Sequence, residues 1–117
     1  MEIDFKDDVS HPVPPEIGFC LFRILQEALH NAIKHSGVKR IEVELAERSN
    51  ELHLKIRDSG RGFDIEEAMR GSGLGLTSMQ ERARLVGGTI AVESKPMQGT
   101  SIHVRIPIQA KASSSAA

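Results

Sequence analysis

The 117-residue chain has no tryptophan or tyrosine and only four phenylalanines. Proteins that bind single-stranded nucleic acid stack bases on exposed aromatic rings, so this composition argues against such a site. The formal net charge of −1 at pH 7 provides no basic field for a phosphate backbone or an anionic membrane. What remains is an ordinary soluble domain with 39% hydrophobic and 26% charged residues.

Cysteine and long apolar runs are also scarce. The single Cys20 lies in an apolar helical stretch, which favours a buried small side chain in a reducing compartment. No apolar run approaches the roughly 18 residues of a membrane span, and the N-terminus has no signal-peptide pattern. We therefore expect a cytoplasmic domain, whose longer parent protein could still be membrane-anchored.

Alternating apolar and polar residues predict strands, and helical spacing predicts two substantial helices. We expect an edge strand and four main strands at residues 2–5, 39–47, 51–57, 89–94 and 100–108. Ser49 and Asn50 would close a hairpin, and the helices would run from Glu16 to about His35 and from Thr77 to Val86. This pattern predicts an α+β two-layer sandwich with a mixed, largely antiparallel sheet, helices on one face and water on the other.

The domain boundaries follow from composition. Residues 1–109 are expected to form one domain, because a chain of this length supports a single hydrophobic core. Residues 110–117 are a tail rich in small residues and are expected to be disordered.

The first candidate site lies directly after the strand at residues 51–57. Asp58, Gly60 and Gly62 form an Asp-x-Gly-x-Gly pattern, in which the strand brings a carboxylate to the edge of the core. The two glycines leave no side chain in the way of a planar ligand. A plain turn from strand to loop explains this segment equally well on its own.

The second candidate lies on the long helix, where Glu27, Asn31 and Lys34 share one stripe. Carboxylate and amide oxygens can hold Mg²⁺, and an ammonium group can meet phosphates. The alternative is a solvated helix face. His30 and His35 are five residues apart and off a common face, which argues against a transition-metal pair.

The third candidate is the stretch from Gly71 to Leu76 with the helix behind it. Glycines allow backbone amides to approach an anion, and a helix N-terminus adds partial positive charge. The alternative is a mobile loop without a ligand. No Walker loop is present, and the glycines do not follow a strand as a dinucleotide-binding fingerprint requires.

In order and approximate spacing, these segments resemble the N, G1 and G2 boxes of histidine-kinase ATPase domains, within the GHKL (Bergerat-fold) superfamily of gyrase, heat-shock chaperone and mismatch-repair ATPases. The resemblance covers roughly residues 14–107. It is carried by Glu27-x-x-x-Asn31-x-x-Lys34-His35, Asp58-x-Gly60-x-Gly62, Gly71-x-Gly73-x-Gly75 and Gly99-Thr100. The stretch at residues 23–29 looks especially like sensor kinases paired with helix-turn-helix response regulators.

The resemblance implies an ATP·Mg²⁺-binding catalytic domain of a sensor histidine kinase in two-component signalling. Its partners would be ATP, a dimerisation domain with the phosphoacceptor histidine and, indirectly, a response regulator, but no nucleic acid and no direct membrane contact. None of the five histidines lies in a second helical hairpin, so the acceptor would be separate. ATP hydrolysis by this domain alone is expected to be very slow.

At the adenine end, the resemblance assigns Asp58 as acceptor for the exocyclic amine. Gly60 and Gly62 would lie beside the base, and Thr100 would form a hydrogen bond near Asp58.

At the phosphate end, Asn31 would coordinate Mg²⁺ and Glu27 would orient that shell, which makes these two the catalytic and metal-binding residues. Lys34 and His35 would approach phosphate oxygens. The lid over the triphosphate would include Gly73, Leu74, Gly75 and Leu76.

Two positions depart from the family pattern. His30 occupies a position that more often holds Asn or Thr, and Gln80 stands where many relatives have Arg. Two alternative functions stay open: a serine-directed kinase of the anti-sigma-factor type, and a nucleotide-responsive interaction module without turnover.

Overall fold

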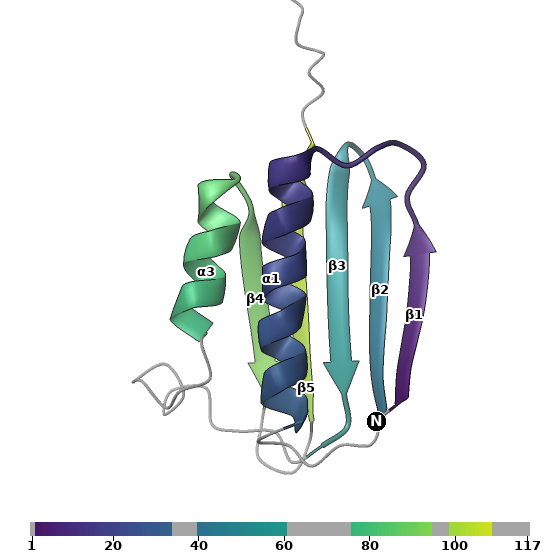
Figure 1. Cartoon of the computed structure of the whole chain (residues 1–117), viewed down its shortest axis with the longest axis vertical. Coiled ribbons are helices and arrows are strands. Elements are labelled where there is room, and N and C mark those ends of the chain that lie inside the picture. Colours follow the sequence, from purple (N-terminus) through teal and green to yellow (C-terminus); the bar gives the residue numbers. More distant parts are fainter. Residues whose placement is uncertain (1, 34–39, 61–75, 95–98, 109–117) are drawn as a thin grey trace, which may run out of the picture.

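The computed structural model describes residues 2–33, 40–60, 76–94 and 99–108. Within them, five strands and two helices form two layers (Figure 1). In chain order, the elements are β1 (Glu2–Asp8), α1 (Pro15–Asn31), β2 (Arg40–Arg48), β3 (Glu51–Asp58), α3 (Leu76–Leu85), β4 (Thr89–Ser94) and β5 (Thr100–Pro107). The predicted tail at 110–117 lies outside the described residues.

The strands form one sheet in the order β1-β2-β3-β5-β4. β1 pairs with β2 in parallel, and the three other pairings are antiparallel. The β2–β3 hairpin turns at Ser49 and Asn50, whose φ angles of 53° and 64° are left-handed, as a tight hairpin turn requires. The predicted mixed, largely antiparallel sheet is confirmed. The predicted edge strand is also confirmed, and it extends to Asp8.

Both helices pack on the same face of the sheet (Figure 1). The fully buried large side chains come from both layers and include Ile24 of α1, Met79 of α3 and Ile106 of β5. The opposite face exposes charged residues such as Lys55 and Arg57. The strand pattern therefore predicted the two-layer sandwich correctly. Neither α1 nor α3 has the length and apolar character of a membrane-spanning helix.

α1 differs from its predicted range at its C-terminal end. The regular helix ends at Asn31, and Ala32 and Ile33 continue in a wider turn, while the predicted end near His35 lies outside the described residues. Ile33, the last described residue of this segment, is 64% exposed. It follows Ile24 by nine residues, about two and a half turns, so it points away from the sheet.

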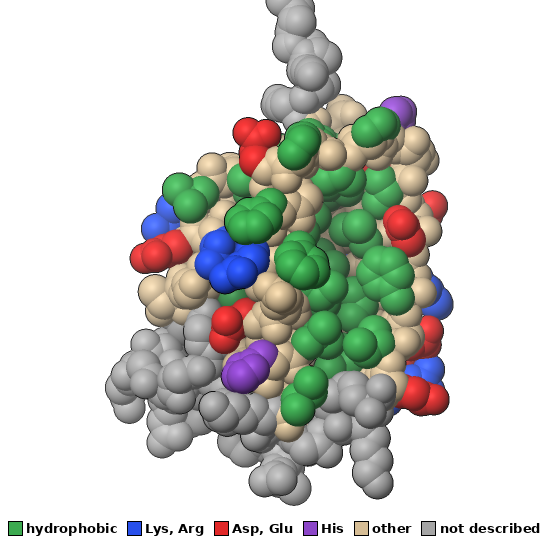
Figure 2. Space-filling view, viewed as in Figure 1, with side chains coloured by type: hydrophobic (Ala, Val, Ile, Leu, Met, Phe, Trp, Pro, Cys, Tyr) green, Lys and Arg blue, Asp and Glu red, His purple; other side chains and the backbone are tan. Residues whose placement is uncertain are grey.

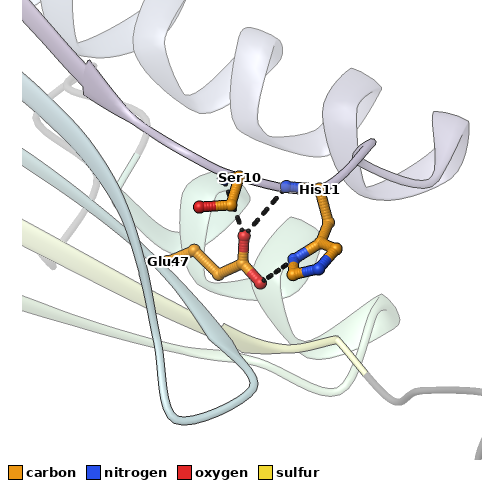
Figure 3. Close-up of polar contacts among 3 residues, drawn as sticks. All are labelled: Ser10, His11 and Glu47. Carbon is orange, nitrogen blue, oxygen red and sulfur yellow. Dashed lines mark hydrogen bonds and ion pairs between the residues drawn. The ribbon is translucent and has the colours of Figure 1, made fainter.

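The connection between β1 and α1 is held by Glu47 at the end of β2 (Figure 3). The backbone N–H groups of Ser10 and His11 both donate to Glu47 Oε1, at 3.0 and 3.1 Å. The ring Nδ1 of His11 lies 2.7 Å from Oε2. The hydrogen bond from His11 is the main cause that lowers the pKa of Glu47, and the two backbone bonds add to it. These contacts set where the chain enters α1.

Candidate functional site

The predicted site residues that the structure describes lie toward one end of the molecule. The C-terminal ends of α1 and β3 and the N-terminal ends of α3 and β5 all lie at this end (Figure 1). These four ends carry Asn31, Asp58, Leu76 and Thr100. The topology therefore brings Asn31, Asp58, Leu76 and Thr100 to a common edge of the two layers.

Asp58, the last residue of β3, is half-buried. Its Oδ1 accepts a hydrogen bond from the backbone N–H of Gly60 at 2.9 Å. This local turn orients the carboxylate at the strand end, because the side chain bonds to the backbone two residues on. An ionised carboxylate has further acceptor capacity on both oxygens, so it can also receive a ligand N–H.

Gly99 packs against the backbone of Asp58. It has φ +83°, and a Cβ built there would lie 2.4 Å from the Asp58 carbonyl oxygen and 3.0 Å from Ser59 Cα. Only a residue without a side chain fits this approach. The predicted Gly99-Thr100 pair therefore requires glycine at position 99 for steric reasons.

Thr100 stands directly opposite Asp58 in the β3–β5 register. Its Oγ1 lies 2.9 Å from Ser94 Oγ, and the Ser94 hydroxyl donates to the Gly99 carbonyl at 3.1 Å. Because the Ser94 hydroxyl proton is already donated to the Gly99 carbonyl, the Thr100 hydroxyl donates its proton to Ser94 Oγ. Ser94 was not predicted from the sequence as a site residue. The signal that could have found it is the hairpin register, which pairs Ser94 with Thr100.

Glu27 and Asn31 lie one turn apart near the C-terminal end of α1. Asn31 is buried, with 9% of its surface exposed, and Glu27 is half-buried. The alternative of a solvated helix face is therefore wrong for Asn31. Mg²⁺ is commonly bound by one or two protein oxygens together with phosphates and water, and an amide and a carboxylate supply that donor set.

No group of three or more His, Cys, Asp or Glu side chains in residues 2–33, 40–60, 76–94 and 99–108 is arranged to hold a metal ion by itself.

The remaining predicted site residues divide into two groups. Leu76 begins α3 and is 3% exposed, so its side chain belongs to the core. The others, Lys34, His35, Gly62, Gly73, Leu74 and Gly75, lie outside the described residues.

Comparison with known proteins finds a matching family and similar proteins. The family described as histidine kinase-, DNA gyrase B- and HSP90-like ATPase matches residues 19–110. The signal transduction histidine-protein kinase/phosphatase DegS of Brevibacillus brevis is 36% identical over 107 residues, 91% of this chain and 28% of that protein. The sensor protein VraS of Staphylococcus aureus is 41% identical over 105 residues, 90% of this chain and 28% of that protein. The chain thus spans less than a third of these relatives.

Solved structures share the fold. The histidine kinase domain of the Erythrobacter litoralis blue-light activated kinase EL346 matches with a TM-score of 0.75 at 19% identity, over 95% of this chain and 54% of that one. The ATP-binding domain of PrrB from Mycobacterium tuberculosis matches with a TM-score of 0.66 at 27% identity, over 87% of this chain and 80% of that one.

Proposed function

Because the chain belongs to the family of histidine kinase-, DNA gyrase B- and HSP90-like ATPases, we propose that it binds ATP·Mg²⁺ and transfers the γ-phosphoryl group to a histidine on a separate dimerisation domain. Transfer of this kind needs little covalent chemistry from the protein, which contributes positioning and charge neutralisation. The observation that carries the proposal is the placement of Asn31, Asp58 and Thr100 at one end of the fold.

At the adenine end, Asp58 is the acceptor for the exocyclic amine. Its orientation by Gly60 and the close packing of Gly99 behind it support this role. Guanine presents a carbonyl at the same place, which would leave the carboxylate facing another acceptor. A mismatch of this kind costs on the order of 2–3 kcal/mol, so the site selects adenine. Thr100 and Ser94 hold the backbone beside Asp58.

At the phosphate end, Asn31 and Glu27 would hold Mg²⁺, which would supply positive charge against the phosphates. The burial of Asn31 supports this assignment, since a buried amide keeps one orientation. By the family pattern, Lys34 and His35 would approach the phosphates, and Gly73 and Gly75 would belong to the lid.

Nucleotide-binding measurements test the proposed roles at both the adenine end and the phosphate end of the site. We expect Asp58→Asn to weaken ATP binding about tenfold or more and to reduce the preference over GTP, because an amide offers a donor as well as an acceptor. Asp7→Asn, on the exposed strand β1, is the matched control. Asn31→Ala should remove the Mg²⁺-dependence of binding while the protein stays folded. Equal ATP and GTP affinity in the unchanged chain would contradict the proposal.

A phosphoryl-transfer assay tests which kind of residue accepts the phosphoryl group. With [γ-³²P]ATP and the parent kinase's dimerisation domain, we expect an acid-labile phosphohistidine. Acid-stable phosphoserine on an anti-anti-sigma partner would instead identify a serine-directed kinase. Binding of ATP with no transfer to either acceptor would identify an interaction module.

A further inference from the structure

The outer face of the sheet, opposite the helices, carries two histidines on neighbouring strands. His53 of β3 and His103 of β5 alternate with buried residues of their strands, so both side chains point away from the core. Figure 2 shows the helix side of the molecule, where hydrophobic side chains form a continuous surface beside α1. The sheet therefore separates the histidine pair from the helix that carries Glu27 and Asn31.

The strand register brings the two rings together. In the antiparallel β3–β5 pairing, His53 stands opposite Arg105 and His103 stands opposite Lys55, which makes the two histidines diagonal neighbours on one face. The Nδ1 atom of His53 lies 2.9 Å from the Nε2 atom of His103, and the ring planes are tilted by 34°. β3 has a paired strand on each side, and so does β5. The backbone under each ring is thus held by two neighbouring strands.

The distance between the two nitrogens is suited to a metal ion. At a metal–nitrogen distance of about 2.0–2.1 Å, nitrogens 2.9 Å apart subtend an angle of about 90° at the metal. Cu²⁺ and Ni²⁺ in square-planar or tetragonal sites take neighbouring ligands at this angle, and imidazole suits both metals. Tetrahedral zinc needs the nitrogens roughly 0.4 Å further apart. The pair therefore favours a tetragonal cation.

Glu51 orients one of the two rings. Its Oε1 atom lies 3.3 Å from His53 Nε2 and 3.6 Å from the Nε atom of Arg105. A carboxylate at this ring nitrogen places the proton on Nε2 and leaves the lone pair on Nδ1, which is the atom that faces His103. Histidines that bind metals almost always have such a partner on the other ring nitrogen. Glu51 thus prepares His53 Nδ1 to act as a ligand.

A groove beside the pair has room for the rest of a coordination shell. It has a volume of about 130 Å³ and is lined by Glu44, Ala46, Arg48, His53, Lys55 and His103. Ala46 stands opposite His53 in the β2–β3 register, so a small side chain adjoins the ring. A water molecule takes up roughly 30 Å³, so the groove accommodates a cation with several water ligands. The half-buried Glu44 carboxylate offsets part of the charge of Arg48 and Lys55, whose exposed ends can extend into water.

We propose that His53 and His103 together bind one divalent transition-metal ion of the Cu²⁺ or Ni²⁺ class, with water in its remaining coordination positions. The metal replaces the hydrogen bond between the rings. His53 Nδ1 and His103 Nε2 become the ligands, and the proton on His103 Nε2 moves to Nδ1 of the same ring by exchange with water. The site lies five residues along β3 from Asp58, about 17 Å, so it is separate from the proposed nucleotide site.

Metal titration of tag-free protein without nucleotide tests the site. By calorimetry, we expect Ni²⁺ to bind at one equivalent per chain, and His53→Gln and His103→Gln each to weaken binding about tenfold or more. His30→Gln is the matched control, because His30 is an exposed histidine on α1 outside this groove. Excess Mg²⁺ should leave the Ni²⁺ affinity within about twofold, since Mg²⁺ prefers oxygen ligands. Because nucleotide is absent, failure here leaves the proposed kinase function standing.

Electron paramagnetic resonance of bound Cu²⁺ counts the nitrogen ligands in the unchanged chain, so this test does not depend on a variant that must fold. We expect coupling to two imidazole nitrogens in the unchanged chain and to one in His103→Gln. Glu51→Gln should keep both nitrogens and weaken binding by about tenfold, as expected for a residue that only positions a ligand. Coupling to fewer than two nitrogens in the unchanged chain would overturn the proposal, as would equal Ni²⁺ affinity in the unchanged chain and both groove-histidine variants. Loss of binding in His30→Gln alone would place the metal on α1 instead.

Discussion

The backbone of Gly99 lies against that of Asp58 so closely that a Cβ at position 99 would be 2.4 Å from the Asp58 carbonyl oxygen. Gly99→Ala must therefore displace the end of β3 and also adopt φ near +83°, which is unfavourable for alanine. We expect a loss of about 1–3 kcal/mol of unfolding free energy and weaker ATP binding. Urea denaturation and nucleotide titration measure the two effects. An unchanged urea midpoint would show that this contact is not tight in solution.

Gly18→Ala is the matched control for that substitution. Gly18 lies inside α1, and a Cβ there would have only Val13 Cγ1 within 4 Å, at 3.8 Å. Alanine loses less conformational entropy than glycine in a helix, so we expect a gain of about 0.5–1 kcal/mol. The same urea experiment measures it. Destabilisation here would mean that the N-terminal part of α1 is packed more tightly than described.

The strands were predictable because each buries one side of a period-2 pattern. Leu52, Leu54 and Ile56 alternate with polar residues, and this alternation holds wherever one sheet face is covered. The hairpin turn was predictable for a local reason, since Ser49-Asn50 interrupts two such runs. The carboxylate at Asp58 followed from its place at the end of a strand.

Other features depend on contacts that no local pattern specifies. The parallel pairing of β1 with β2 joins segments separated by more than thirty residues. Ser94 joins the site only through the register of β4 on β5. Arg82 of α3 and Glu27 of α1 line one groove only because the two helices pack side by side. Sequence spacing on one helix predicts which residues share a face, but not what the next helix adds to it.

Cys20 should be a slowly reacting thiol. Burial is the main cause that raises its pKa, and the charge of Arg82 opposes this only in part. Because the thiolate is the reactive form, a raised pKa reduces the reactive fraction at pH 8. We expect alkylation by iodoacetamide to be about tenfold or more slower in the folded protein than in urea. Mass spectrometry follows the reaction at the single cysteine. Equal rates would indicate that α1 and α3 separate readily.

On the outer face of the sheet, His53 and His103 form a hydrogen-bonded pair. His53 Nδ1 lies 2.9 Å from His103 Nε2, and His53 Nε2 lies 3.3 Å from Glu51 Oε1. With Nε2–H of His53 directed at Glu51, the proton between the rings belongs to His103, which donates to His53.

This pair predicts how stability depends on pH. Burial, followed by the nearby charge of His53, lowers the pKa of His103 below its ordinary value of 6.5. The unfolded chain therefore takes up this proton first as the pH falls, so the contribution to stability is present above pH 6.5 and decreases below it. Both rings are partly solvated, so we expect less than about 1 kcal/mol between pH 7.5 and 5.5. Urea midpoints across this range should vary less in His103→Gln, which keeps a hydrogen-bond donor to His53, than in the unchanged chain. His30→Gln, on the exposed side of α1, should keep the full dependence. An identical pH profile in His103→Gln would assign the effect to other groups.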